Sequence, residues 1–373
     1  MAWWHKLVMH RRPIRVLVVD DSLVMRSLLR MVLASEPAIE LAGIAADGAS
    51  ALDAVDHLKP DLILLDIEMP RMNGIEMLAD LRSRRHPAKV IMCSTLTRRG
   101  ASITLEALAR GASDYVTKPT TQHGAADAVA TLSRDLLPKI KALYPQQEPE
   151  ATYNLVPETR PSASVKRASI VVIGVSTGGP TALETLLPQI PGDFPVPIVI
   201  AQHMPRLFTS LLAERLDRES QLTVREAVAG ERVVAGNVYL AQGDWHLQLT
   251  RAVFGRGYAL RLLQPAPEDF CRPSVDVLFC SAADACGDGV IGLVLTGMGS
   301  DGLEGCRAIR KAGGHVVVQD RASSAVWGMP GIVTDAGLAH RVLPLHAIAA
   351  ELVRLCPPQR TSILRRLSAH AVH

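Results

Sequence analysis

Short apolar runs alternate with amphipathic stretches over the first part of the chain. We expect the apolar runs to be strands covered on both faces, and they lie at 14–19, 39–45, 62–65, 90–93 and 114–116. Between them, apolar residues recur at helical spacing over 23–33, 48–58, 74–84 and 102–110, and then at Val129, Leu132, Leu136, Ile140 and Leu143. Five strand–helix units in succession predict a doubly wound parallel α/β sheet over 14–144, with its site at the carboxyl ends of the strands.

The same alternation returns in the second half. Strand candidates lie at 170–173, 196–201, 289–296 and 315–319, and helical patterns at 180–187, 208–216, 272–285, 303–312 and 345–355. Residues 238–264 instead alternate apolar and polar side chains around turns, which predicts an antiparallel hairpin on the sheet. Residues 327–330 are expected in a loop. The pattern predicts a second doubly wound, Rossmann-like parallel α/β domain over 169–357.

Apolar periodicity stops between the two predicted domains. Residues 145–168 are dominated by Pro, Glu, Ser and Gln, as in a linker. Such a linker is either a tether that lets one domain dock on the other and be released, or a passive spacer. Residues 1–13 are an N-terminal extension, either a tail or sequence upstream of a start at Met9, and residues 358–373 are a C-terminal tail.

Composition narrows the classes of function. A formal charge of +3 over 373 residues and an aromatic content of 4% disfavour a nucleic-acid-binding surface. No apolar run approaches the length of a membrane span, and no signal-peptide pattern is present, so no direct membrane insertion is expected. The cysteines form no C-x-x-C pair, which favours reduced thiols and a cytoplasmic protein; they are Cys93, Cys271, Cys280, Cys286, Cys306 and Cys356.

Polar residues follow the predicted strands of the first domain. Asp20 and Asp21 end the first strand, Asp66 the third, Ser94 the fourth, and Lys118 follows the fifth. Three carboxylates brought together repel each other unless they hold a cation, and their hard oxygens suit Mg²⁺. Singly, the first two aspartates would serve as helix caps and the lysine as a surface charge. Together, these residues predict a carboxylate that accepts a phosphoryl group beside a metal ion.

In these residues, the stretch from Ile14 to Leu143 resembles the receiver domain of two-component response regulators. The resemblance implies that Asp66 accepts the phosphoryl group, with a histidine kinase as phosphodonor. It implies a Mg²⁺ site in which Asp20 and Asp21 are the acidic pair, Asp21 is a direct ligand, and the carbonyl of Glu68 is the third protein ligand. It further implies that Ser94 and Tyr115 are switch residues and that Lys118 pairs with the phosphate.

Three strand ends of the second domain carry candidate catalytic residues. Ser176 lies in a G-x-S-x-G turn between a strand and a helix, where such a serine is either a nucleophile or only a helix cap. His203 follows the next strand. Asp301 follows the strand at 289–296, either as a helix cap or as the residue that orients the histidine. A nucleophile, a base and an orienting carboxylate, each at the end of a different parallel strand, predict acyl transfer. The order Ser, His, Asp differs from the Ser, Asp, His of ordinary α/β-hydrolases.

The motifs around these residues resemble the catalytic domain of the chemotaxis protein-glutamate methylesterases. They are Ser176–Pro180, Gln202–Pro205, Arg272–Phe279, Thr296–Gly302 and Gly328–Pro330. The resemblance implies hydrolysis of glutamyl methyl esters on the cytoplasmic helices of chemoreceptors, deamidation of receptor glutamines, and no cofactor for the esterase reaction. Backbone N–H groups of the Ser176 and Gly297–Met298–Gly299 turns are the candidates for an oxyanion hole, and Ser274 is expected only as a cap. Ser300 departs from the family, in which Asn is expected.

Domain order suggests regulation by phosphorylation. We expect the unphosphorylated receiver to pack over the Ser176 edge and block the substrate. Phosphorylation of Asp66, with the chemotaxis histidine kinase as phosphodonor, is expected to loosen that docking. The competing interpretations are a phosphorylation-regulated serine hydrolase with another substrate and a DNA-binding response regulator. A DNA-binding response regulator would require a helix-turn-helix with a basic face after the linker. The sequence has a strand–helix pattern with the serine turn at that place.

Overall fold

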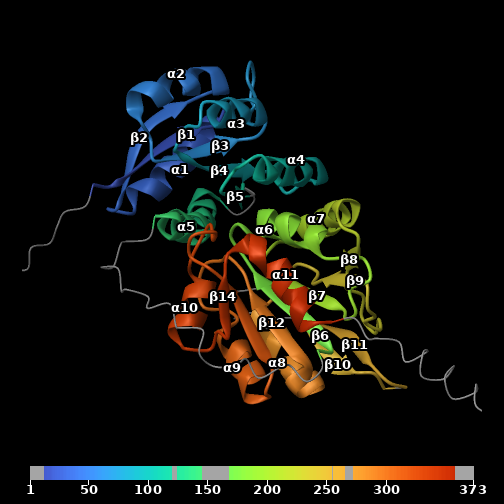
Figure 1. Cartoon of the computed structure of the whole chain (residues 1–373). Helices are drawn as coiled ribbons and strands as arrows, with labels where there is room; N and C mark the ends of the chain where they lie inside the picture. Colours follow the sequence, from blue (N-terminus) through green and yellow to red (C-terminus); the bar gives the residue numbers. More distant parts are fainter. Residues whose placement is uncertain (1–11, 120–123, 145–167, 254, 265–271, 358–373) are drawn as a thin grey trace, which may run out of the picture. The chain divides into compact units, whose positions relative to one another are not determined.

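The computed structural model describes residues 12–119, 124–144, 168–253, 255–264 and 272–357 (Figure 1). The chain divides into two compact units, Met1–Pro149 and Glu150–His373, and each is described by itself. The predicted extension, linker and tail lie almost entirely outside the described residues.

The first unit is a five-stranded parallel sheet with the strand order β2-β1-β3-β4-β5. Helices α1 and α5 pack together on one face, and α2, α3 and α4 follow one another on the other (Figure 1). The strands are β1 (Ile14–Val19), β2 (Ile39–Ala45), β3 (Leu62–Asp66), β4 (Lys89–Ser94) and β5 (Asp114–Thr117). The helices are α1 (Leu23–Ala34), α2 (Gly48–Leu58), α3 (Gly74–Ser83), α4 (Arg98–Ala109) and α5 (Ala125–Leu143). The doubly wound parallel sheet predicted from the sequence is confirmed.

Helix α4 begins four residues earlier than predicted, at Arg98 rather than at residue 102. Its N-cap is Thr97, whose side chain accepts a hydrogen bond from the backbone N–H of Gly100 at 3.0 Å. The cap satisfies one of the unpaired N–H groups of the first turn. Because Arg98 and Arg99 are exposed, the first turn carries no apolar signal that the sequence pattern could have detected.

The second unit is a seven-stranded parallel sheet with the strand order β14-β13-β12-β6-β7-β9-β8. Its strands are β6 (Ile170–Val175), β7 (Ile198–Gln202), β8 (Thr223–Glu226), β9 (Asn237–Leu240), β12 (Val290–Val294), β13 (His315–Gln319) and β14 (Arg341–Leu343). Helices α6 (Gly179–Leu186), α7 (Arg206–Glu219) and α11 (Leu345–Leu355) pack against one another, as do α8 (Val275–Cys286), α9 (Leu303–Lys311) and α10 (Met329–Asp335). Short 3₁₀ turns follow α6 at Leu187–Gln189 and α8 at Gly287–Gly289.

The predicted hairpin over 238–264 was wrong in its first part. β9 joins the main sheet, where it pairs in parallel with both β7 and β8. Only β10 (His246–Arg251) and β11 (Tyr258–Leu263) are antiparallel, and they form a separate two-stranded sheet. The predicted loop at 327–330 was also wrong at its end, because α10 begins at Met329 with Pro330 in its first turn. The sequence pattern had not predicted β8 or β14.

The centre of the second sheet is formed by β12, β6 and β7, which lie side by side in register. Gly174 on β6 pairs with Val294 on β12 and with Ala201 on β7. From β6 the chain first builds outward through β7 and later returns to build outward on the other side through β12. Such a reversal opens a crevice at the carboxyl ends of the strands, where ligands of doubly wound sheets bind.

Two further predictions can be compared with the described part of the chain. None of its helices combines the length and the apolar character that crossing a bilayer would require. Five of its cysteines are free thiols, and Cys93, Cys306 and Cys356 are buried. Cys271 lies outside the described residues.

Candidate functional site

Ser176 lies directly after the middle strand of the second sheet. Its backbone is held by three partners: its N–H donates to the carbonyl of Thr296 at 3.0 Å, and its carbonyl accepts from the N–H of Gly179 at 2.8 Å and from Gln202 Nε2 at 3.0 Å. The N-cap of α6 is Gly178 in the left-handed conformation, with φ of 77° and no side-chain cap. Ser176 is therefore not the cap of this helix, and its hydroxyl makes no hydrogen bond among the described residues.

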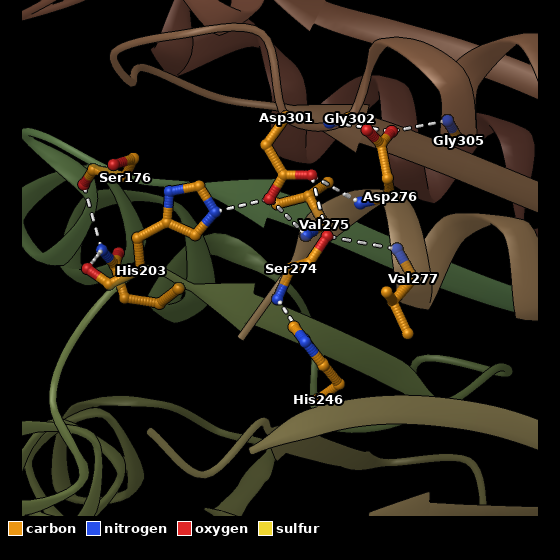
Figure 2. A network of polar contacts seen from close by, with 11 residues as sticks. Ser176, His203, His246, Ser274, Val275, Asp276, Val277, Asp301, Gly302 and Gly305 are labelled. Carbon is orange, nitrogen blue, oxygen red and sulfur yellow. Dashed lines mark hydrogen bonds and ion pairs between the residues drawn. The ribbon is translucent and has the colours of Figure 1, made fainter. Parts of the chain in front are cut away.

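His203 lies directly after β7, beside the serine turn. Its backbone N–H donates to the carbonyl of Val175 at 3.1 Å, which fixes it opposite the end of β6. Its Nε2 lies 2.7 Å from Oδ2 of Asp301, and both side chains are largely shielded from solvent. Figure 2 shows the other ring nitrogen, Nδ1, on the side that faces Ser176. No hydrogen bond joins Ser176 to His203 within the described residues.

Asp301 is held at the start of α8 rather than at the start of its own helix. Its Oδ2 accepts from the backbone N–H of Val275 at 2.7 Å, and its Oδ1 accepts from the N–H of Asp276 at 2.9 Å and from Ser274 Oγ at 3.0 Å. Burial acts to raise the pKa of Asp301, but the hydrogen bond from His203 and the backbone N–H groups outweigh it and lower the pKa to about 2. The carboxylate stays ionised and holds the imidazole in one orientation.

Three residues of this network had no predicted role in it. Ser274 caps α8, as expected, by accepting from the N–H of Val277, but it also donates to Asp301. Asp276 accepts from the N–H groups of Gly302 and Gly305 at the start of α9. Gln202 Nε2 donates to the carbonyls of Ser176 and His203 and so ties the two turns together. The only sequence signal for these contacts was the position of the polar residues at strand and helix ends.

Some backbone N–H groups near Ser176 already donate a hydrogen bond, and others are left to bind an oxyanion. Those of Ser176 and Gly297 already donate, to the carbonyls of Thr296 and Val326 respectively. Those of Met298 and Gly299 donate to no acceptor within the described residues. Gly297 adjoins the serine closely, since a Cβ placed on it would lie 2.8 Å from the Cβ of Ser176. The N–H groups of Met298 and Gly299 are therefore candidate donors for an oxyanion hole.

In the first unit, the sheet brings three carboxylates together. Ligand oxygens of Asp20, Asp21 and Asp66 all lie within 4.8 Å of one another. Lys118 Nζ lies 2.7 Å from Oδ1 of Asp66 and 2.8 Å from Oδ2 of Asp20. Lys118 is therefore not a solvated surface charge. The first two aspartates are not helix caps either, because the N-cap of α1 is Ser22.

The chemistry of this acidic cluster fits Mg²⁺. Burial, opposed by Lys118 and reinforced by the charge of Asp20, raises the pKa of Asp66 to about 6. Oδ2 of Asp20 is buried and has no well-directed hydrogen bond, although the ammonium of Lys118 is close to it. Hard carboxylate oxygens that repel one another are the ligands this ion prefers. The exposed side chain of Glu68 pairs with Arg99 at 3.3 Å instead, so only its carbonyl is a candidate ligand.

The two predicted switch residues are buried near the ends of β4 and β5. Ser94 Oγ accepts a hydrogen bond from Thr104 Oγ1 on α4 at 2.7 Å. The ring of Tyr115 lies under Lys139, whose Nζ is 4.8 Å from the ring centroid. Burial raises the pKa of Tyr115 well above its usual range. The serine is thus linked to the helix that follows the acidic site.

Comparison with known proteins covers both units. Residues 171–352 match the family model of the CheB methylesterase, and residues 16–130 match that of the response regulator receiver domain. A protein-glutamate methylesterase/protein-glutamine glutaminase of Nocardioides sp. is 46% identical over 94% of this chain and 98% of its own length. One of Trichodesmium erythraeum is 43% identical over 91% of this chain and 98% of its own length.

A solved structure, the Thermotoga maritima CheB methylesterase catalytic domain, has 42% sequence identity and a TM-score of 0.49 and covers 50% of this chain and 98% of that one. The two full-length relatives share both the receiver and the catalytic part with this chain. The chain therefore belongs to the protein-glutamate methylesterase/protein-glutamine glutaminase family, hydrolases in which a response regulator receiver domain precedes the catalytic domain.

Proposed function

We propose that the chain demethylates glutamate methyl esters of chemoreceptors, releasing methanol, and deamidates receptor glutamines, through Ser176, His203 and Asp301. The observation that carries this proposal is the 2.7 Å contact between His203 and Asp301, with the second ring nitrogen of the histidine facing Ser176 (Figure 2). The proposed substrate lies on the cytoplasmic helices of the receptors, so the proposed site of action is the cytoplasm.

The geometry supports a two-step acyl transfer. Ser176 Oγ attacks the glutamyl carbonyl carbon while His203 Nδ1 takes the hydroxyl proton. The C–O bond to methoxide, or the C–N bond to the amide nitrogen, then breaks, and the histidine returns the proton to form methanol or ammonia. Water, deprotonated by the same nitrogen, hydrolyses the glutamyl–serine ester. Asp301 stabilises the imidazolium throughout, and the steps balance without a cofactor.

The oxyanion that forms on the glutamyl carbonyl needs hydrogen-bond donors. We assign this role to the backbone N–H of Met298, because it has no acceptor among the described residues and follows Gly297, which adjoins Ser176. A donor aimed at the developing charge contributes about 10²–10³ in kcat in enzymes of this kind.

Activation is proposed to follow phosphorylation of Asp66 by a histidine kinase. Asp20, Asp21 and Asp66, with the carbonyl of Glu68, would hold Mg²⁺, which when bound offsets the negative charge of the incoming phosphoryl group. Lys118, already 2.7 Å from Asp66, would pair with a phosphoryl oxygen. Ser94 and Tyr115 would then respond to the new charge. The hydrogen bond between Ser94 and Thr104 offers a physical link from the acidic site to α4.

Replacement of the nucleophile tests the catalytic proposal. Ser176→Ala should lower methanol release from methylated chemoreceptor fragments by at least about 10³-fold, since it removes the group that attacks the ester. Ser300→Ala is the matched control, because this exposed serine is in the turn beside Asp301 and has no proposed role. Full methanol release by Ser176→Ala would refute the covalent mechanism.

A further inference from the structure

Helices α8 and α9 start side by side, and each helix start is capped by an aspartate that belongs to the other one. Asp301, just before α9, accepts the first N–H groups of α8 from Val275 and Asp276. Asp276, in the first turn of α8, accepts through its Oδ1 from the N–H of Gly302 at 2.9 Å and of Gly305 at 2.6 Å (Figure 2). The N-cap position of α9 is Gly302, which has no side chain for this purpose. The two helix starts therefore depend on each other.

This exchange of caps determines where the carboxylate of Asp301 lies. Asp301 directly precedes Gly302, so the hydrogen bond from Gly302 to Asp276 holds the peptide beside it. The helix starts are also in close contact, since a Cβ on Gly305 would lie 2.4 Å from the Cβ of Phe279 and 3.3 Å from the Cα of Asp276. Among the described residues, only the side chain of Asp276 forms side-chain hydrogen bonds between α8 and the first turn of α9.

The choice of an aspartate at position 276 has an electrostatic cost. Burial and the neighbouring charge of Asp301 raise the pKa of Asp276 to about 6, although the N–H groups of Gly305 and Gly302 act in the opposite direction. A neutral cap would accept the same two N–H groups without placing a second carboxylate beside Asp301. What Asp276 contributes to the placement of Asp301 is therefore the position of its acceptor oxygen and not its charge.

We propose that Asp276 is a positioning residue for the esterase reaction: it clamps the start of α9 to α8 and so aims the carboxylate of Asp301 at His203. It touches neither the substrate nor the nucleophile. This inference rests on the proposed role of the Ser176, His203 and Asp301 triad and adds a residue to which neither the sequence pattern nor the family resemblance gave a role.

The test compares variants of the full chain, all treated with the same phosphodonor, on methyl-esterified chemoreceptor cytoplasmic fragments. Asp276→Ala removes the acceptor and should lower kcat by about 10–100-fold with KM changed by less than about twofold, because a misplaced catalytic group slows the chemical step. Asp276→Asn retains an Oδ1 acceptor and should recover most of the lost kcat. Asp284→Ala removes an exposed carboxylate from the same helix and should keep the kcat of the unaltered chain.

Three results would overturn the proposal: an unchanged kcat in folded Asp276→Ala, an equal loss in Asp284→Ala, or a loss in Asp276→Asn as large as in the alanine variant. If Asp276→Ala does not fold, Asp276→Glu replaces it. That variant keeps the charge but displaces the acceptor by one methylene, and an unaltered kcat would then count against the clamp. Ser176→Ala, assayed in parallel, distinguishes failure of the Asp276 clamp from failure of the proposed function. Activity retained by Ser176→Ala would contradict the proposed function itself.

Discussion

At the scale of single residues, two aspartates with opposite electrostatic environments define the two sites. Hydrogen bonds outweigh burial at Asp301 and lower its pKa to about 2, so this carboxylate stays charged. At Asp66 burial dominates and raises the pKa to about 6, so this carboxylate gains from any cation that approaches it. The first environment suits a residue that orients an imidazole. The second suits a residue that works beside a metal ion.

The raised pKa of Asp66 makes stability depend on pH. The folded state binds this proton more tightly than the unfolded chain, so Asp66 destabilises the fold increasingly as the pH rises from about 4 through about 6. Asp66→Asn removes that cost and should raise the free energy of unfolding by about 1–3 kcal/mol at pH of about 7.5, in the presence of a chelator. The gain should shrink through about pH 6 and nearly vanish near pH 4.

Calorimetric unfolding at several pH values measures this effect. The matched control is Asp53→Asn, which neutralises an exposed aspartate of α2 that has no ion pair among the described residues and should change stability little at any pH. A variant at position 66 that is less stable than the unaltered chain, or one whose gain does not depend on pH, would contradict the argument.

Most site residues could be predicted from the sequence because each one directly follows an apolar strand. Asp20, Asp66, Ser176 and His203 are of this kind, and parallel strands bring their carboxyl ends to one edge. Asp276 could not be predicted in this way, because its partners are the N–H groups of a helix that starts 26 residues later. Backbone donors are the same in every sequence, so such a contact leaves no compositional signal.

At the scale of elements, the close approach of α8 and α9 is set by Gly305. Gly305→Ala should destabilise the second unit by about 1–3 kcal/mol, because its Cβ would lie 2.4 Å from that of Phe279 and the well-packed helices would have to separate. Helix propensity alone gives the opposite sign, a gain of about 1 kcal/mol for Gly→Ala. The sign of the change in unfolding free energy therefore shows whether helix packing or helix propensity dominates at position 305.

Urea unfolding followed by tryptophan fluorescence suits this measurement. Trp245 and Trp327 lie in the second unit, and the remaining two tryptophans, Trp3 and Trp4, lie outside the described residues. Arg307→Ala is the control, since within the described part of the chain this exposed α9 residue pairs only with exposed Glu304, and its loss should change stability by less than about 0.5 kcal/mol. A stabilised Gly305→Ala variant would show that the contact relaxes without cost.

The bounds of the strands were predicted more accurately where the strands are buried. The largely buried strands β1, β3 and β13 have a continuous apolar stretch at their centre, and each was predicted to within a residue of its ends. β6 was predicted two residues too short, because Gly174 and Val175 were assigned to the serine turn. β8 and β14 are short, partly exposed and mixed in composition, so no apolar run marks them. β9 was assigned to a hairpin because alternation reveals a half-buried strand but not its partner.

At the scale of the whole molecule, the receiver and the catalytic unit are joined by a segment without apolar periodicity. If the unphosphorylated receiver restrains the esterase, removal of residues 1–167 should raise the basal rate of methanol release severalfold, because the restraining partner is gone. The full chain treated with a phosphodonor should approach the same rate, and its Asp66→Asn variant should not respond.

Initial rates on one preparation of methylated receptor fragments measure all three proteins. Circular dichroism of the truncated chain is the control for folding. A folded fragment with an unchanged or lower rate would contradict the idea that the receiver restrains the catalytic unit.

The placement of the triad on three adjacent strands has a consequence for biosynthesis. β6 and β7 leave the ribosome long before β12, and His203 and Asp301 are 98 residues apart in the sequence. A nascent or half-folded chain therefore carries the serine and the histidine without the carboxylate that orients them. If the proposed triad carries out the reaction, ester hydrolysis requires that the central strand β6 has both of its neighbours, β7 and β12, in place. The return of activity after denaturation would accordingly report the last long-range step of folding rather than the first.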